Sequence, residues 1–165
     1  MENKMRLEIS ALSVNESFAR SAVAAFALIL APSLTELSDI KTAVSEGVTN
    51  CIVHAYKTPS ADNKIIIECK AVEEEIGGIL HIKICDFGCG IEDVEQAITP
   101  FYTTLEDEER SGMGFTIMQT FTDGFSVSSE RGKGTTLTMF KKMGAKPKYA
   151  ASEGKGIAEK ERVHA

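Results

Sequence analysis

Hydrophobic and polar residues follow two different periods along the chain, and these periods separate the predicted strands from the predicted helices. Strict alternation is typical of a strand with one buried face, and it recurs in five short segments. These are residues 6–12, 64–72, 80–84, 125–130 and 136–140. Glycines at 77–78 and at 132 and 134 lie between the last four segments, which are therefore predicted to form two hairpins.

Two helices are predicted between the first and second strands, and a third, shorter one at 113–121. Capping boxes, each a serine with a glutamate three residues later, place the first two helix starts at Ser13 and Ser33. Pro32 is expected to end the first helix. The expected buried faces are Phe18, Ala22, Phe26 and Ile29 in the first helix, and Leu37, Ile40, Val44, Val48, Cys51, Ile52 and Ala55 in the second.

The order of these elements predicts a two-layer α/β (α+β) sandwich, in which helices cover one face of a single mixed sheet. Residues 1–143 are expected to form one domain, since the 165-residue chain has the 43% hydrophobic content of a globular protein. Residues 144–165 contain few large apolar side chains, and we expect this tail to be disordered.

The distribution of charge narrows the choice of partners. The whole chain has a net charge of −6, but residues 141–165 hold seven Lys/Arg against three Asp/Glu, so residues 1–140 carry −10. This acidic body argues against direct binding of nucleic acid, whose phosphates are neutralised by Lys and Arg. A phosphate ligand would instead be bound by backbone N–H groups and a metal ion.

Membrane insertion and a zinc site are also disfavoured. The longest apolar run, residues 22–32, is about half the length that a membrane span requires. The N-terminus has no apolar signal core, so we expect a cytoplasmic protein. The four cysteines lack the paired spacing of a zinc site and are expected to be reduced.

Glu46, Asn50 and His54 are spaced by four residues and therefore share one face of the second predicted helix. A solvated polar face is the simpler interpretation. However, asparagine is a poor helix former and is rarely placed in mid-helix for stability. An amide oxygen and a carboxylate one turn apart could hold a hard cation and accept a proton, respectively.

Three glycine-containing segments follow along the chain. Asp86-Phe87-Gly88-Cys89-Gly90 comes directly after a strand, where its carboxylate could accept a hydrogen bond from the amine of a base. Residues 110–114, Arg-Ser-Gly-Met-Gly, open a helix whose free N–H groups form an anion site. Residues 132–135, Gly-Lys-Gly-Thr, join two strands. Each segment alone is also compatible with an ordinary turn or helix start.

Together, in this order, the motifs resemble those of the Bergerat-fold (GHKL) ATPases, the family of gyrase, Hsp90, histidine kinases and MutL. The resemblance spans residues 40–138, and residues 45–56 are similar to the N box of that family. Within the family, residues 100–104 (Pro-Phe-Tyr-Thr-Thr) and 109–118 closely resemble the anti-sigma-factor serine kinases of spore-forming bacteria.

The resemblance implies a role for each matching residue. Glu46 would be the catalytic base for a substrate serine, and Asn50 would ligate Mg²⁺. Asp86, supported by Thr135, would bind the adenine amino group. The ATP or ADP would be admitted by Gly88 and Gly90, its phosphates would be lined by Gly112, Met113, Gly114 and Phe115, and residues 92–111 would be the lid.

Two arginines complete the implied set. Related lids often carry a Thr-Thr-Lys-Pro sequence, whereas Thr104 is here followed by Leu105 and four acidic residues, so Arg110 is the remaining nearby cation. Arg20, on the exposed side of the first helix, resembles the position at which family members meet protein partners.

The resemblance implies a homodimeric anti-sigma factor that sequesters a sporulation sigma factor (sigma-F). It would use Mg-ATP to phosphorylate a serine on a small anti-anti-sigma protein. Two alternatives remain open: a nucleotide-gated sigma-binding module with incidental catalysis, and a GHKL ATPase that hydrolyses ATP to drive conformational work.

Overall fold

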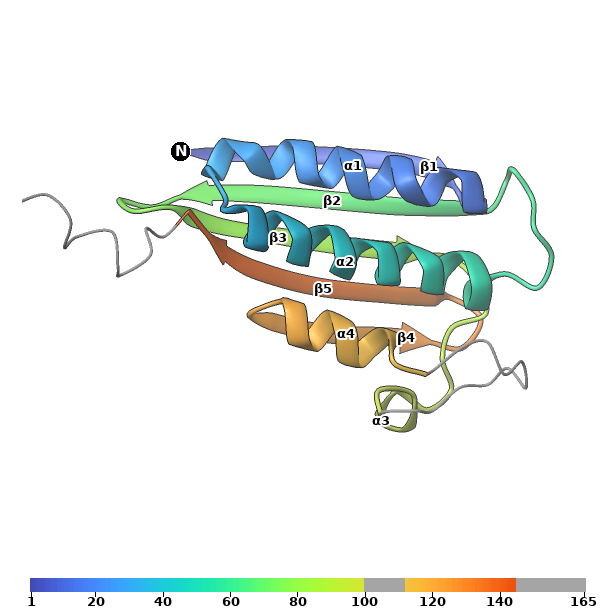
Figure 1. The fold of residues 1–165 in the computed structure, drawn as a ribbon. Helices are drawn as coiled ribbons and strands as arrows, with labels where there is room; N and C mark the ends of the chain where they lie inside the picture. The colour runs from blue at the N-terminus through green and yellow to red at the C-terminus, as the bar shows by residue number, and fades with distance from the viewer. Residues whose placement is uncertain (100–111, 145–165) are drawn as a thin grey trace, which may run out of the picture.

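The computed structural model describes residues 1–99 and 112–144. Five strands form one sheet in the order β1-β2-β3-β5-β4, and the long helices lie over one face of it (Figure 1). The strands are β1 (Glu2–Ser10), β2 (Lys64–Glu73), β3 (Gly78–Asp86), β4 (Gly124–Glu130) and β5 (Gly134–Met143). The helices are α1 (Glu16–Ala27), α2 (Leu34–Asn50), α3 (Val94–Ala97) and α4 (Gly114–Phe121), with 3-10 turns η1 (Ser13–Asn15) and η2 (Leu28–Leu30) and a π-helical turn η3 (Cys51–Ala55). The predicted two-layer α+β sandwich is confirmed.

Neighbouring strands of this sheet pair antiparallel throughout, in place of the mixed pairing that the element order predicted. The connections explain the difference. The two helices α1 and α2 join β1 to β2. Because α1 runs back along the sheet and α2 runs forward again, the chain returns to the end of the sheet where β1 stops, so β2 runs antiparallel to β1. β3 and β4 run in the same direction, but β5 lies between them and pairs with both.

The core lies between the sheet and the helices, and α2 is buried as its apolar stripe predicted. Ile40, Val44 and Val48 of α2 have no exposed surface. A Cβ at Gly47 would lie 2.7 Å from Cδ1 of Ile84, so this glycine lets the helix approach the sheet closely. The sheet contributes the buried side chains Ile65, Ile67, Leu80, Ile82, Ile84, Leu137 and Met139.

The buried face of α1 differs from the prediction. Its buried residues are Ala19, Val23, Ala24 and Ala27, whereas Phe18 is 54% exposed. The helix carries two apolar stripes, and periodicity alone does not choose between them. The stripe of small side chains faces the core because it lets α1 pack closely beside α2.

Only one of the two predicted capping boxes forms. At the start of α2, the N–H of Glu36 donates to Ser33 Oγ at 3.2 Å, and the N–H of Ser33 donates to the Glu36 carboxylate at 2.6 Å. The box predicted at Ser13 is absent, because the chain makes the η1 turn there. The Glu16 carboxylate instead accepts a hydrogen bond from Ser45 Oγ of α2 at 2.6 Å, which ties the two helices together.

All four cysteines are free thiols; Cys51 and Cys69 are buried, whereas Cys89 is exposed. Among the helices that the structure describes, none has the length and apolar character needed to cross a membrane. The predicted tail beyond Gly144 and most of the predicted lid, residues 100–111, lie outside the described residues.

Candidate functional site

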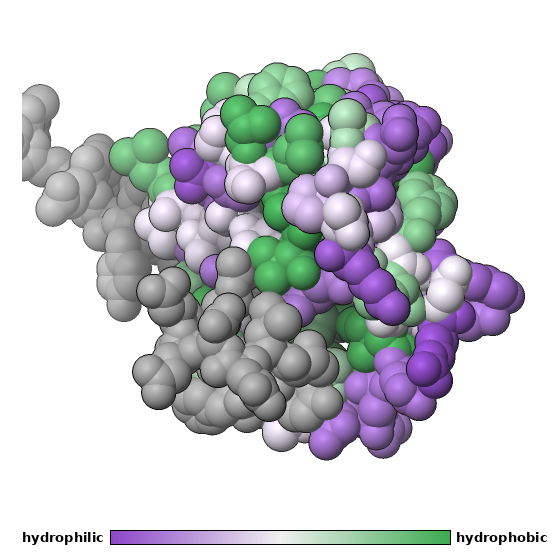
Figure 2. Space-filling model, turned by 90° about the vertical axis from the view of Figure 1, so that its right-hand side faces the viewer, coloured by the Kyte–Doolittle hydropathy of each residue, from purple (hydrophilic) through white to green (hydrophobic). Residues whose placement is uncertain are grey.

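One pocket collects most of the residues that the sequence singled out. Its volume is about 780 Å³, and its lining residues include parts of α2, α3 and the start of α4. The end of α2, the start of α4 and α3 lie at the same end of the molecule (Figure 1). Figure 2 looks at this end, where both hydrophilic and hydrophobic residues reach the surface. The predicted site residues that line the pocket are Glu46, Asn50, Asp86, Gly90, Gly112, Met113, Gly114, Phe115 and Thr135.

Glu46 and Asn50 enter the pocket from the same face of α2 and meet the first residue of α4. A Cβ built at Gly114 would lie 3.2 Å from both Asn50 Oδ1 and Glu46 Oε2. Glycine therefore keeps a space open beside an amide oxygen and a carboxylate oxygen, which are ligands that hard cations prefer. Among the described residues, no cluster of three or more His, Cys, Asp or Glu side chains is arranged to hold a metal ion.

The environment of Glu46 suits a proton acceptor. Burial raises the pKa of this carboxyl, and the negative charge of Glu16 raises it further. A carboxylate with a raised pKa binds a proton more tightly, which makes it a better general base in the pH range where it is still ionised.

The N-terminus of α4 opens onto the same pocket without a side-chain cap. Met113 is its N-cap residue and makes no capping hydrogen bond through its side chain. The first N–H groups of a helix lack intrahelical partners and carry partial positive charge. Phe115 packs against Phe125 of β4, with ring centroids 5.9 Å apart, and this contact anchors the first turn. The helix start can therefore bind an anion with few cationic side chains.

Asp86 ends β3 and is only 6% exposed. Its Oδ1 accepts the N–H of Gly88 at 3.0 Å and that of Thr135 at 3.2 Å. Burial raises the pKa of Asp86, although these two N–H groups and a hydrogen bond from the Cys51 thiol lower it. A carboxylate has about four acceptor sites, so three donors leave room for one more, such as an exocyclic amine.

Gly88 and Gly90 have different surroundings. Gly90 lines the pocket with φ of +70°, and a Cβ there would lie 2.2 Å from the carbonyl oxygen of Glu130. Gly88 is not a lining residue: its Cβ would lie 2.0 Å from the carbonyl oxygen of Ala55. The N–H of Cys89 donates to that same oxygen at 2.7 Å. The structure thus gives Gly88 a packing role against the end of η3, and its role in admitting a nucleotide stays a prediction.

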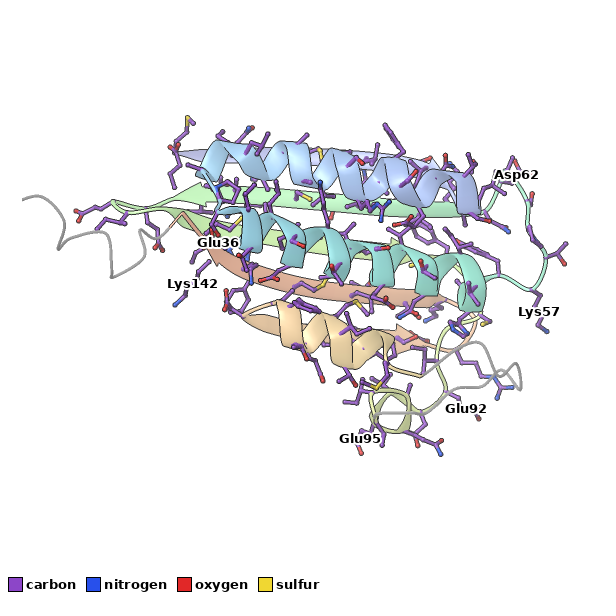
Figure 3. The ribbon with its side chains drawn as sticks, viewed as in Figure 1. Glu36, Lys57, Asp62, Glu92, Glu95 and Lys142 are labelled. Atoms are coloured by element: carbon purple, nitrogen blue, oxygen red, sulfur yellow. The ribbon has the colours of Figure 1, made fainter. Side chains whose placement is uncertain are left out.

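Of the two arginines in the predicted set, only Arg20 is among the described residues, and it does not line the pocket, as expected of a residue predicted to contact a protein partner. Arg20 is an exposed residue of α1, and its Nε lies 3.7 Å from Glu16 Oε1. Arg110 lies outside the described residues. The described start of the predicted lid contains α3, and Figure 3 shows Glu95 on this short helix and Glu92 close to it.

Several pocket residues were not predicted. His54 was placed on the same helix face as Glu46 and Asn50 by its four-residue spacing, but no role was predicted for it. The π-helical turn η3 has no sequence signal, and Leu137 reaches the pocket only through the register of the sheet. The lining residues without a predicted role in the site are Thr49, Cys51, His54, Ala55, Cys89, Ile91 and Leu137, whereas Glu92, Asp93, Gln96 and Ala97 belong to the predicted lid.

Known proteins are similar to this chain in sequence and in fold. Residues 9–141 match the family profile of the histidine kinase-like ATPase domain. The structure of the RsbU and RsbW domains of a Mycobacterium tuberculosis protein superposes with a TM-score of 0.59 at 15% identity, over 86% of this chain and 32% of that one. Fold and pocket thus define a histidine kinase-like ATPase domain of the Bergerat type.

Curated proteins with higher sequence identity indicate which kind of histidine kinase-like ATPase domain this is. The anti-sigma F factor of Clostridium perfringens (strain SM101) is 52% identical over 143 residues, which cover 87% of this chain and 99% of that protein. The anti-sigma F factor of Thermoanaerobacter sp. (strain X514) is 52% identical over 144 residues, covering 87% and 96%. That of Clostridium acetobutylicum is 49% identical over 142 residues, covering 86% and 95%. The chain belongs to the histidine kinase-like ATPase family, and within it to the anti-sigma F factors.

Proposed function

We propose that this protein is an anti-sigma factor and an ATP-dependent protein serine kinase. It sequesters a sigma factor, sigma-F, and phosphorylates a serine on a small anti-anti-sigma protein. The observation that carries the proposal is the open space at Gly114, which lies beside both Glu46 and Asn50 and next to the uncapped start of α4. An amide oxygen that can ligate Mg²⁺ and N–H groups that can bind phosphates are thus close together, as the binding of a magnesium-bound triphosphate requires.

The proposal assigns the two ends of ATP to two ends of the pocket. The Asp86 carboxylate accepts a hydrogen bond from the adenine amine, and Thr135 supports this contact. Asn50 contributes its amide oxygen to Mg²⁺, and the N–H groups at the start of α4 bind the phosphates beside Gly112, Met113 and Phe115. When bound, Mg²⁺ neutralises the negative charge of the phosphates. Arg110, in the predicted lid, would add positive charge to the same end.

Glu46 acts as the catalytic base. It accepts the proton of the substrate serine while the serine oxygen bonds to the γ-phosphorus. The bond from that phosphorus to the bridging oxygen breaks, and ADP leaves with the electron pair. Because such transfer depends mainly on positioning and on neutralisation of charge, a fixed carboxylate and a helix start suffice on the protein side.

Partner binding is assigned to α1, away from the pocket. Arg20 is exposed there, so a sigma factor or an antagonist protein can contact it without entering the nucleotide site. The family resemblance also supports a homodimer. Replacing Arg20 by Glu is expected to weaken capture of the sigma factor while the dissociation constant for ATP stays within about twofold, as usual for a surface change away from the site.

The test is Glu46→Gln, which keeps the size and polarity of the side chain but removes the base. Purified wild type and variant are incubated with labelled ATP, the sigma factor and the antagonist. The variant should bind ATP as wild type does, yet transfer label to the antagonist at least about a hundredfold more slowly.

Other outcomes separate the alternatives. Full label transfer by Glu46→Gln would remove Glu46 from the mechanism. Release of free phosphate with no labelled antagonist would indicate an ATP hydrolase. A wild type that captures the sigma factor only with ATP, but labels nothing, would indicate a nucleotide-gated binding module.

A further inference from the structure

Ser129 lies behind the pocket and contacts two of its walls without lining it. The N–H of Ile91 donates to Ser129 Oγ at 2.8 Å. The same Oγ is 2.9 Å from Thr135 Oγ1 and 3.0 Å from the carbonyl oxygen of Gly134. Ile91 and Thr135 both line the pocket, so one hydroxyl connects the chain after β3 with the start of β5, next to the β4–β5 turn.

The segment around Ile91 is held against that turn by backbone contacts as well. The N–H of Gly132 donates to the carbonyl oxygen of Cys89 at 2.7 Å. Gly90 lies so close to Glu130 that a Cβ would meet its carbonyl oxygen at 2.2 Å. The hydrogen bond from the Ile91 N–H to Ser129 Oγ adds a side-chain contact to these backbone contacts, and Ile91 directly precedes the predicted lid.

The network continues from Ser129 to Asp86. Thr135 is held at its side chain by Ser129, and its own N–H donates to Asp86 Oδ1 at 3.2 Å. A shift of Thr135 therefore displaces both the hydroxyl and the N–H that orient the base end of the pocket. These hydrogen bonds are partly buried, so a donor or acceptor that loses its partner there costs free energy, and loss of the Ser129 hydroxyl would disturb Ile91 and Thr135 together.

We propose that Ser129 is a positioning residue for recognition of the adenine base. It acts through Thr135 and Ile91, and it makes no contact with the nucleotide itself. The inference rests on the proposed binding of ATP, with Asp86 at the base. Adenine presents an amine donor to the Asp86 carboxylate, whereas hypoxanthine presents a carbonyl oxygen there, which an ionised carboxylate does not bind. Ser129 thus contributes to the part of the affinity that depends on the base.

Ser129→Ala is tested by calorimetric titration with ATP and with inosine triphosphate. We expect the dissociation constant for ATP to rise about five- to tenfold, the size of one hydrogen bond, while that for inosine triphosphate rises less than twofold. Ser129→Thr keeps the hydroxyl and should restore the preference for ATP. Label transfer at saturating ATP should remain within about twofold of wild type, since Glu46, Asn50 and α4 are untouched.

Ser128→Ala is the matched control, because Ser128 is the exposed neighbour of Ser129 on β4. It should leave both dissociation constants unchanged. An equal loss of affinity for the two nucleotides in Ser129→Ala, or no loss, would overturn the inference. If Ser129→Ala does not fold, failure of Ser129→Thr to keep the wild-type preference for ATP overturns it instead. A wild type that binds neither nucleotide contradicts the proposed function itself.

Discussion

The ammonium of Lys141 lies 2.9 Å from the Asp39 carboxylate and 2.9 Å from the carbonyl oxygen of Phe121, so one largely buried cation joins three elements. Asp39 belongs to α2, Phe121 is the last residue of α4, and Lys141 lies in β5. A cation stabilises the C-terminal end of a helix. Lys141 therefore fixes the end of α4 that is remote from the pocket and ties it to α2, which carries Glu46 and Asn50.

Lys141→Met is expected to lower the free energy of unfolding by about 3 kcal/mol, because it leaves Asp39 largely buried without its partner. Urea denaturation monitored by circular dichroism measures this loss. Lys142→Met changes the exposed neighbour and should stay within about 0.5 kcal/mol of wild type. Equal stability of the two variants would show that the Asp39 pair contributes nothing. The double variant Asp39→Asn/Lys141→Met should regain part of the loss.

Gly114→Ala separates ligand binding from folding. Alanine is the better helix former, so the melting temperature should be unchanged or higher. The added Cβ would lie 3.2 Å from Asn50 Oδ1 and Glu46 Oε2, in the space assigned to the magnesium-bound phosphates. Calorimetry should show affinity for Mg-ATP reduced at least about tenfold, or about 1.4 kcal/mol. As a control, Thr120→Ala at an exposed position of the same helix should leave the affinity for Mg-ATP unchanged. An unchanged affinity in Gly114→Ala would instead show that the phosphates bind elsewhere.

Asp86→Asn tests the buried carboxylate through pH. Burial raises the pKa of Asp86 in the folded protein, so the folded state holds this proton more tightly than the unfolded state. The contribution of Asp86 to the free energy of unfolding therefore falls as pH rises from the unfolded pKa, about 3.9, through the folded pKa. Asparagine does not titrate, so the variant should gain stability relative to wild type as the pH rises from about 4 through the folded pKa of Asp86.

The same Asp86 variant should lose binding of ATP, because an amide nitrogen opposite the adenine amine places two donors together. Urea unfolding at several pH values and calorimetry measure the two effects. A stability difference that does not change with pH would mean that Asp86 titrates alike in the folded and unfolded chain.

Glu16→Gln should shift the pH profile of phosphate transfer. Burial is the larger cause of the raised pKa of Glu46, and the charge of Glu16 is the second. Removing that charge lowers the pKa of Glu46, so the acid limb of the transfer rate should move to lower pH. Glutamine can still accept the hydrogen bond from Ser45. The measurement is the transfer rate at saturating ATP and antagonist as a function of pH, with Glu8→Gln at an exposed position as the control. An acid limb that does not move in Glu16→Gln would argue against Glu46 as the titrating base.

Gly88→Ala is expected to damage the fold more than the ligand site. The new Cβ would lie 2.0 Å from the backbone of Ala55, and a backbone atom cannot move aside as a side chain does. We expect a loss of about 2 kcal/mol or more in the free energy of unfolding. At Gly132 a Cβ would meet nothing within 4 Å, and only the positive φ of +78° opposes alanine, at a cost of about 1 kcal/mol. Urea denaturation should therefore rank Gly88→Ala as the more destabilised variant.

Local periodicity in the sequence was sufficient to predict the helices and strands and part of the candidate site. A four-residue spacing places Glu46 and Asn50 on one face wherever the helix lies, because the helical repeat is set by the backbone. The capping box at Ser33 formed for the same reason, as its two partners are three residues apart. The box at Ser13 did not form, because the chain makes the η1 turn there and Glu16 accepts a hydrogen bond from Ser45, which is distant in sequence.

The sequence by itself determined the five strands, the amphipathic second helix and the set of polar and glycine residues from which a nucleotide site can be built. Only the tertiary structure decided which stripe of α1 is buried, that Gly88 packs on Ala55, and that Ser129 supports Thr135. Each of these depends on contacts between segments far apart in the chain. Periodicity predicts which face of its own helix or strand a residue occupies. Contacts between distant segments depend instead on how strands and helices pack closely together, which periodicity does not contain.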